Sequence, residues 1–317
     1  MRNLLRGLSA FMDDAAYAAR LAVTGVAIER ELDVLLQAEP RPGEPARPER
    51  LIEAMRYATL GGGKRLRPFL TVETARALGR QDKGPLRAGA AIECVHAYSL
   101  IHDDLPAMDD DDLRRGRPTT HRAFGEATAI LAGDALQALA FEILAVPATD
   151  AIAEVRAALC AGLARAIGPA GMVGGQMLDI DAERATAPLS VREIDRLQAM
   201  KTGALLKFSV EAGSRLAGAG AKASAALAAY GRAIGAAFQI ADDILDAEGD
   251  FVTLGKRTGK DAGRNKATLV GALGLQGARR QLARLTDEAT AAIDAAGLGA
   301  AGDALRATAR FVATRKK

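Results

Sequence analysis

The sequence predicts an all-α fold, a single domain in which about ten or more helices surround a central cavity. Apolar residues recur every three or four positions along most of the chain, which is the period of a helix. No segment alternates apolar and polar residues as a half-buried strand does. Aromatic residues make up 4% of the 317 residues and Trp is absent, so Ala and Leu must supply most of the packing. This composition favours close contacts between helices.

The predicted helices follow one another with short breaks. Apolar residues mark one face of an early helix at Leu21, Ile28, Leu32, Leu35 and Leu36. This helix ends near Glu39, where a proline-rich link begins. The link lies too close to the N-terminus to separate two domains, so residues 1–317 are expected to form one domain. Pro68 suits the first turn of another helix. The remaining predicted helices span residues 51–60, 86–105, 120–145, 151–167, 191–216, 224–247 and 276–295.

Composition also limits the class of protein. The formal net charge is +3, and no basic tail suggests nucleic-acid binding. Cys94 and Cys160 are the two cysteines, and because both lie in apolar surroundings and show no metal-ligand spacing, they are expected in the core. Residues 1–14 lack the apolar centre of a signal peptide. No apolar stretch of about 18 residues runs without charge, so no membrane span is expected. A cytoplasmic protein is the simplest expectation.

The most informative segment is acidic. It reads Asp103-Asp104-Leu105-Pro106-Ala107-Met108-Asp109 and continues through three further aspartates into Arg114-Arg115-Gly116. Crowded carboxylates repel one another unless a cation lies among them, and oxygen ligands suit Mg²⁺. Pro106 should break the helix and allow Asp109 to return beside Asp103. A solvated acidic loop is the alternative. A calcium loop is disfavoured, because the EF-hand glycine and terminal Glu are missing.

Basic residues directly follow this acidic segment. Arg114 and Arg115 suit a phosphate-bearing ligand, because guanidinium groups bind phosphate oxygens bidentately. Alternatively, they neutralise Asp110–Asp112 at the surface. His96 and Ser99 lie on the same predicted helix face as Asp103.

A second acidic segment lies near the end of a later predicted helix. Gln239, Asp242, Asp243 and Asp246 are spaced i, i+3, i+4 and i+7, so they share one stripe. Such a stripe is costly to bury unless it faces water, metal or a ligand. An ordinary exposed face is the alternative, although no Lys or Arg is interleaved.

Three further features suggest anion binding. Lys201, followed by Thr202, lies within an apolar helical stripe, where it either extends to solvent or meets an anion in an internal cleft. Glycines 61–63 precede Lys64 and Arg67 at a helix start, which exposes backbone N–H groups, although a plain turn is equally consistent. A glycine-rich loop, also consistent with a solvated loop, carries Lys256, Arg257, Lys260, Arg264 and Lys266.

Together these segments resemble the trans-prenyl diphosphate synthase family over nearly the whole chain. The four residues between Asp104 and Asp109 resemble the bacterial farnesyl diphosphate synthase type, as do residues 96–102, 174–179, 201–203 and 238–246. The resemblance implies an isoprenoid synthase-like fold with a central active-site cavity. It also implies condensation of isopentenyl diphosphate with dimethylallyl or geranyl diphosphate. Homodimers and three Mg²⁺ ions per site are expected on the same ground.

The resemblance also implies roles for individual residues. Asp103, Asp109 and Asp242 would bind the metal ions, assisted by Asp104, Asp243 and Asp246. The allylic diphosphate would be held by Arg114, Lys201 and Lys256. Isopentenyl diphosphate would be held by Lys64, Arg67, His96 and Arg115. Thr202 and Gln239 would face the developing cation. The roles of Asp110, Asp111, Asp112, His102 and His121 stay open.

Product length is predicted from residues just before the first acidic segment. In the trans-prenyl diphosphate synthases that this chain resembles, a bulky side chain just before the first acidic motif blocks the growing prenyl chain. Tyr98 is therefore the expected floor for a fifteen-carbon product. On a regular helix Tyr98 points about 140° away from Asp103, and Ser99 lies more directly beneath it. Core packing is the alternative role for Tyr98, and geranylgeranyl diphosphate is the alternative product.

Three more distant functions also compete. A terpene cyclase shares the acidic motifs but needs no second diphosphate site, so Lys64, Arg67 and Arg115 argue against it. A catalytically silent partner subunit usually loses one acidic motif, and both are present. An unrelated acidic interaction protein would bind no diphosphate in a Mg²⁺-dependent way.

Overall fold

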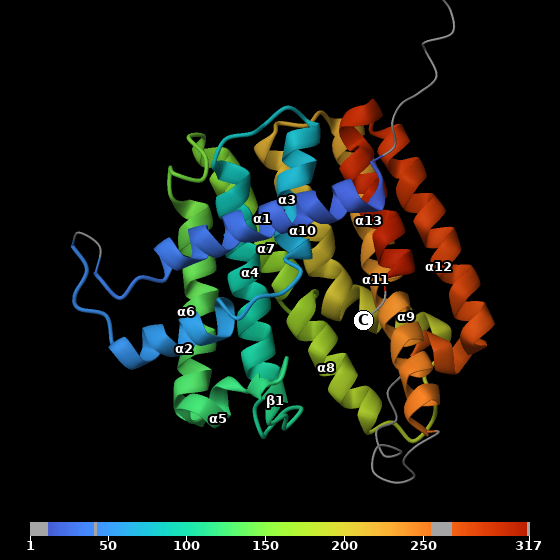
Figure 1. The fold of residues 1–317 in the computed structure, drawn as a ribbon, viewed down its shortest axis with the longest axis horizontal. Coiled ribbons are helices and arrows are strands. Elements are labelled where there is room, and N and C mark those ends of the chain that lie inside the picture. Colours follow the sequence, from blue (N-terminus) through green and yellow to red (C-terminus); the bar gives the residue numbers. More distant parts are fainter. Residues whose placement is uncertain (1–11, 41–42, 255–267, 316–317) are drawn as a thin grey trace, which may run out of the picture. The chain divides into compact units, whose positions relative to one another are not determined.

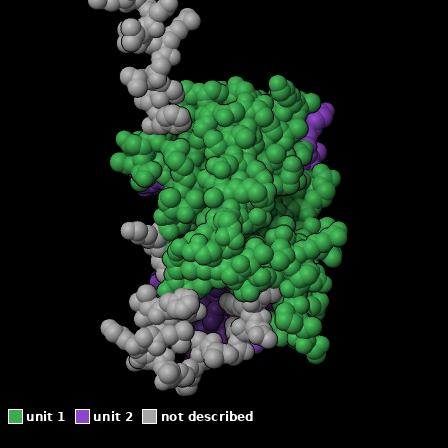
Figure 2. Space-filling model, turned by 90° about the vertical axis from the view of Figure 1, so that its right-hand side faces the viewer, with its two compact units in different colours: residues 1–18, 73–79, 161–317 green, residues 19–72, 80–160 purple. Residues whose placement is uncertain are grey.

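The computed structural model describes residues 12–40, 43–254 and 268–315, the last six residues before the second gap by their backbone only (Figure 1). The described residues are almost entirely helical, from α1 to α13, which confirms the all-α prediction. By its internal contacts the chain divides into two compact units, coloured separately in Figure 2. Unit 1 comprises Met1–Ala18, Glu73–Gly79 and Ala161–Lys317, and unit 2 comprises Ala19–Val72 and Arg80–Cys160. The single domain stays a prediction.

The core of unit 2 is α4 (Gly84–Asp103), whose small residues allow close packing. Ala88, Ala90 and Ala91 have no exposed surface. A Cβ on Gly89 would lie 3.1 Å from Pro68 and 3.2 Å from Ile28, so glycine permits two other segments to approach. Against α4 pack α2 (Glu49–Thr59) and α6 (Glu126–Ala145). Ile28 and Pro68, which approach Gly89, belong to α1 (Asp14–Leu35) and α3 (Leu66–Ala77).

The predicted helix 120–145 is interrupted in the structure. Gly125 has a φ of 88°, which ends α5 (Thr120–Phe124) and begins α6. Glycine adopts this left-handed conformation at no steric cost, so the helical apolar pattern did not reveal the break.

The described residues also form one short β-hairpin, which no alternating pattern in the sequence had indicated. β1 (Leu113–Arg114) pairs antiparallel with β2 (Arg117–Pro118). The two turn residues, Arg115 and Gly116, have φ values of 53° and 75°, which is the pattern of a type I′ hairpin turn. Strands of two residues are too short to show an alternating pattern. The left-handed conformation of Arg115 costs roughly 1–2 kcal/mol, which its contacts must offset.

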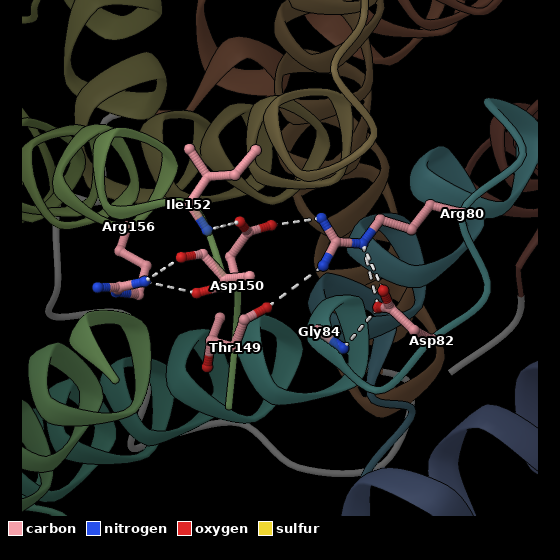
Figure 3. Close-up of polar contacts among 8 residues, drawn as sticks. Arg80, Asp82, Gly84, Thr149, Asp150, Ile152 and Arg156 are labelled. Carbon is pink, nitrogen blue, oxygen red and sulfur yellow. Dashed lines mark hydrogen bonds and ion pairs between the residues drawn. The ribbon is translucent and has the colours of Figure 1, made fainter. Parts of the chain in front are cut away.

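Two ordered loops of unit 2 are joined by a cluster of polar contacts (Figure 3). Arg80 forms an ion pair of 2.5 Å with Asp150 and also bonds Asp82 at 3.0 Å. Asp150 in turn accepts a hydrogen bond of 2.8 Å from the N–H of Ile152, close to the start of α7 (Ala153–Ile167). Arg156 of α7 donates to the Asp150 carbonyl at 2.7 Å. The cluster therefore anchors the loop before α4 to the loop after α6.

Unit 1 is organised around α11 (Ala221–Leu254), which packs against α10 (Ala204–Leu216), α12 (Leu269–Ala295) and α13 (Asp303–Thr314). Tyr230 lies wholly buried on α11, and its hydroxyl donates to the carbonyl of Leu305 at 2.7 Å. At Gly274, where φ is 68°, α12 is kinked. The helix predicted at 224–247 corresponds to α11, which extends further at both ends.

The predicted helix 191–216 contains a change of helix type. The first part is α9 (Val191–Gln198), which begins with a capping box between Ser190 and Glu193. A π-helical turn, Ala199–Gly203, then precedes α10. Two further helices, α8 (Met172–Glu183) and α13, were not predicted.

Two helical segments are long and apolar enough to cross a membrane by length and composition alone, as are core helices of soluble proteins. The first is α6, of which 39% of the tested window is buried. The second, Ala153–Glu183, consists of α7 and α8, which have 15 and 12 residues and are separated by a turn. Each is shorter than the roughly 20 residues that a bilayer span needs.

Candidate active site

The chain reverses direction directly after α4. The backbone N–H of Asp109 donates to the carbonyl of Asp103 across 2.8 Å, and Asp110 adopts a φ of 54°. The turn contains Pro106, as the predicted break requires. Asp109 thus returns beside Asp103, and the acidic segment presents carboxylates from the end of a helix and from the turn after it.

The neighbouring Asp104 forms an ion pair with Arg114. Its carboxylate is 4% exposed and accepts hydrogen bonds from Nη2 at 2.6 Å and from Nε at 2.9 Å. Burial lowers the pKa of Arg114, but the bonds to Asp104 outweigh this effect and raise it. The pair therefore fixes β1 to the end of α4.

The second hairpin arginine lies against the glycine turn of residues 61–63. Arg115 donates through Nη1 to the carbonyl of Gly62. A Cβ on Gly63, whose φ is 131°, would lie 2.8 Å from the same nitrogen. Glycine is needed at this position both for its backbone conformation and for the approach of the guanidinium group.

Three basic residues follow this turn, and they separate by environment. Arg65 is buried, pairs with Glu29 and with Glu93 at 2.5 Å, and donates to the carbonyl of Thr59 at 2.6 Å. It holds the turn in place. Lys64 is exposed and Arg67 is half-buried, so these two can reach a ligand.

His96 lies in a strongly positive environment. Burial, followed by the charges of Arg67, Arg115, Arg65 and Arg114, lowers its pKa well below 6.5. Its imidazole is therefore neutral at pH 7. The structure thus brings Arg67, His96 and Arg115 together within unit 2. Ser99 donates its hydroxyl proton to the carbonyl of His96 at 2.9 Å.

A pocket of about 60 Å³ lies beside the hairpin. Arg114, Arg115 and Arg117 line it together with Tyr57 and Gly61. The guanidinium carbon of Arg117 lies 4.1 Å from the centre of the Tyr57 ring, and the Tyr57 hydroxyl donates to the carbonyl of Pro118 at 2.7 Å. These contacts hold the hairpin near the C-terminal end of α2.

Tyr98 is 5% exposed on α4. Its hydroxyl has no hydrogen-bond partner among the described residues, and burial, followed by the charge of Asp103, raises its pKa to about 12. Its ring meets His102 edge to face, with 5.8 Å between ring centres. His121, whose role was open, lies within 3.1 Å of the Thr119 hydroxyl through Nδ1, where α5 begins.

The second acidic segment belongs to unit 1. Asp242 accepts a 2.6 Å hydrogen bond from Arg315, which also donates to the carbonyl of Phe238 at 3.0 Å. Asp243 accepts hydrogen bonds from Gln198 at 2.9 Å and from the N–H of Leu269 at 3.1 Å, where α12 begins. Burial raises the pKa of Asp243 despite these bonds.

The remaining residues of this segment are more open. Gln239 is half-buried, and Asp246 is exposed. Gln198 and Leu269 had given no sequence signal, because their contacts with Asp243 join distant parts of the chain.

Lys201 and Thr202 lie in the π-helical turn, a feature that is frequent at functional sites. Lys201 forms an ion pair of 2.5 Å with Asp179 of α8. A Cβ on Gly175 would lie 2.1 Å from the backbone nitrogen of Lys201, so α8 packs directly on the turn. Lys256 and the rest of the basic loop through residue 266 lie outside the described residues.

The residue types of the two acidic segments suit metal binding, but the described residues do not form a complete set of metal ligands. Among the residues that the structure describes, no three His, Cys, Asp or Glu side chains are grouped as ligands of one ion. The two segments nonetheless offer carboxylate oxygens, which Mg²⁺ prefers. In each segment one carboxylate already pairs with an arginine, Asp104 with Arg114 and Asp242 with Arg315.

These features define an all-α protein with two aspartate-rich segments and a cluster of cationic side chains suited to phosphate groups. Residues 48–296 match the family described as polyprenyl synthetase. The chain belongs to this family.

Individual relatives agree over most of their length. The chain is 51% identical over 241 residues to the farnesyl diphosphate synthase of Escherichia coli (strain K12), covering 75% of this chain and 80% of that protein. It is 48% identical over 237 residues to the enzyme of the same description from Geobacillus stearothermophilus, covering 74% and 79%. A crystal structure of an FPP/GFPP synthase from Zymomonas mobilis has a TM-score of 0.84 and 44% identity, covering 95% of this chain and 99% of that one.

Proposed function

We propose that this protein is a Mg²⁺-dependent prenyltransferase that condenses isopentenyl diphosphate with dimethylallyl or geranyl diphosphate to give farnesyl diphosphate. The main support for this proposal is the cluster of Arg67, His96 and Arg115 beside the glycine turn. It provides a binding place for a second diphosphate, in addition to the one that metal ions would hold at the aspartates. A terpene cyclase has no use for it.

The isopentenyl diphosphate is held by Arg67, His96 and Arg115, with the exposed Lys64 beside them. The arginines supply paired donors to phosphate oxygens. Neutral His96 adds one N–H donor without further charge. The contact of Arg115 with the Gly62 carbonyl and the ion pair of Arg65 with Glu93 hold the glycine turn in place, which supports a preformed anion site here.

Asp103, Asp109 and Asp242 would hold Mg²⁺, expected as three ions. Asp104, Asp243 and Asp246 would assist them or order water. When bound, Mg²⁺ supplies positive charge that stabilises the departing pyrophosphate. Arg114, Lys201 and Lys256 hold the same allylic diphosphate. For Lys201 this means exchanging its bond with Asp179 for one with the substrate.

The reaction breaks the allylic carbon–oxygen bond and forms one carbon–carbon bond. The double bond of isopentenyl diphosphate supplies the electron pair, and one proton leaves to the released pyrophosphate. The oxygens of Thr202 and Gln239 face the allylic cation and stabilise it electrostatically. Water must be kept out, because it would quench the cation.

Tyr98 is proposed as the floor that stops growth at fifteen carbons, with Ser99 beside it. The buried phenol ring fills space at the base of the acidic segment, and its hydroxyl has no hydrogen-bond partner among the described residues, as expected where a side chain faces an apolar path. Geranylgeranyl diphosphate is the alternative product if the floor lies deeper.

A cytoplasmic homodimer of single-domain chains completes the proposal. Support comes from apolar side chains that unit 2 leaves exposed. On α6 they are Ile130 and Leu131, which is 58% exposed, and on α1 they are Val23, Val26 and Val34. Light scattering after gel filtration at micromolar concentration should give twice the mass of 33.0 kDa. The mass of one chain would remove the homodimer.

The decisive experiment incubates purified protein with labelled isopentenyl diphosphate, Mg²⁺ and each allylic primer, and sizes the products. Fifteen-carbon product from the dimethylallyl and geranyl primers supports the proposal. Twenty-carbon product supports the alternative. No Mg²⁺-dependent condensation with any primer would overturn the function, and a silent partner subunit would then become the better explanation.

A further inference from the structure

We propose that His102, seated against the bare backbone of Gly133, fixes the ring of Tyr98 and so controls product length. The inference rests on the proposed function, in which Tyr98 closes the end of the growing chain's path. His102 is outside the groups proposed to bind substrate or metal, and its role would be to position another side chain.

His102 is held on two sides. Its Nε2 lies 3.1 Å from the carbonyl oxygen of Ile130 on α6, so this nitrogen carries the proton and donates it. Its ring meets Tyr98 edge to face, at an interplanar angle of 67°. Tyr98 lies one helical turn earlier on α4, where residues at i and i+4 are neighbours. The imidazole therefore connects Tyr98 to the backbone of α6.

Gly133 provides the space for this arrangement. A Cβ at this position would lie 2.1 Å from Nε2 of His102, 2.6 Å from Cδ2 and 2.8 Å from Cε1. No other residue can stand at position 133 while the imidazole keeps its place. Glycine inside a helix costs about 1 kcal/mol relative to alanine, so α6 is less stable here than it would be with alanine. In return, the glycine at position 133 leaves room for the His102 ring.

Tyr98 depends on such packing for its orientation. Its side chain is buried, and its hydroxyl has no hydrogen-bond partner among the described residues. No polar contact in the described structure tethers the end of the ring. The edge-to-face contact with His102 thus restricts where the phenol can lie, and loss of that contact would let the ring yield to a longer prenyl chain.

The test compares product lengths made by four variants, Tyr98→Ala, His102→Ala, Gly133→Ala and the double variant Tyr98→Ala/His102→Ala. Tyr98→Ala should lengthen the products. His102→Ala and Gly133→Ala should each raise the share of products longer than fifteen carbons at least threefold. Gly133→Ala should remain folded, because alanine favours the helix and the clashing ring can rotate away. Gly220→Ala is the matched control, since a Cβ there meets no atom within 4 Å.

The double variant separates a positioning role from a direct one. If His102 acts only through Tyr98, its removal adds nothing once Tyr98 is alanine, so the double variant should match Tyr98→Ala. Additional lengthening in the double variant would overturn the inference. So would unchanged products from both His102→Ala and Gly133→Ala when Tyr98→Ala lengthens them, and this result leaves the proposed function intact. Absence of condensation by the unmodified protein would instead remove the proposed function.

Discussion

Arg315 donates a hydrogen bond of 2.6 Å to Asp242, the residue expected to bind metal in the second acidic segment. Its guanidinium carbon lies 3.9 Å from the centre of the Phe238 ring, and its side chain is only 6% exposed. Burial lowers the pKa of Arg315, an effect that Asp242 and Asp246 only partly offset. A cation already occupies one side of this carboxylate, so a metal ion must compete with the arginine for Asp242.

Removal of Arg315 should therefore strengthen metal binding. In Arg315→Ala, we expect Mn²⁺, used as a spectroscopic substitute for Mg²⁺, to bind roughly tenfold more tightly, which corresponds to about 1.4 kcal/mol. Electron paramagnetic resonance titration without substrate measures this directly. Arg284→Ala is the control, because it removes an exposed arginine paired with Glu288 on the same unit. Equal affinities in the two variants would contradict the competition.

The metal-binding role of the two aspartate segments predicts large catalytic losses. Asp103→Ala and Asp242→Ala should each lower kcat by roughly 10²–10³-fold or more, because charge on the departing pyrophosphate would lose much of its stabilisation. Initial rates at saturating Mg²⁺ and substrates provide the measurement. Asp287→Ala, an exposed residue of α12, should keep the unmodified rate. Near-normal turnover in either aspartate variant would remove that residue from the metal site.

How far sequence could predict the structure differs from one feature to another. The period of apolar residues located α2, α4 and α7 to within a few residues, because their buried faces follow the helical repeat. It could not reveal the π-helical turn around Lys201, because nothing in the local pattern marks one inserted residue. Nor could it reveal the hairpin, whose strands have two residues each.

The same distinction holds for the candidate site. The acidic and basic motifs were evident because they are local in sequence, and the return of Asp109 followed from Pro106. Their partners were not evident, because Asp179 lies 22 residues from Lys201 and Arg315 lies 73 residues from Asp242. Only the folded chain brings these pairs together. For the same reason, sequence could not separate buried Arg65 from its neighbours Lys64 and Arg67.

The close packing of α8 on the π-helical turn predicts a strong effect of a single methyl group. In Gly175→Ala, the added Cβ would lie 2.1 Å from the Lys201 nitrogen and 2.5 Å from its Cα. Both atoms belong to the backbone, so α8 must move, and overpacking of this kind costs about 1–3 kcal/mol. Urea denaturation should show this loss, and kcat should fall because Lys201 moves with the turn. Gly220→Ala serves again as the control, and equal stability of the two variants would show that α8 adjusts freely.

The contact between Arg80 and Asp150 predicts a pH dependence of stability. Burial tends to raise the pKa of Asp150, but the hydrogen bonds from Arg80 and Ile152 outweigh it and lower the pKa below the usual value of 3.8. A carboxyl group with a lowered pKa in the folded state stabilises that state at pH values above its unfolded pKa. This stabilisation is lost as the pH falls through the lower, folded-state pKa.

Asp150→Asn should therefore reduce the free energy of unfolding by about 1–3 kcal/mol at pH 7, and by progressively less below about pH 4. Urea titrations of both proteins between pH 7 and pH 3 measure the difference, and a difference that stays constant over this range would show that ionised Asp150 contributes nothing.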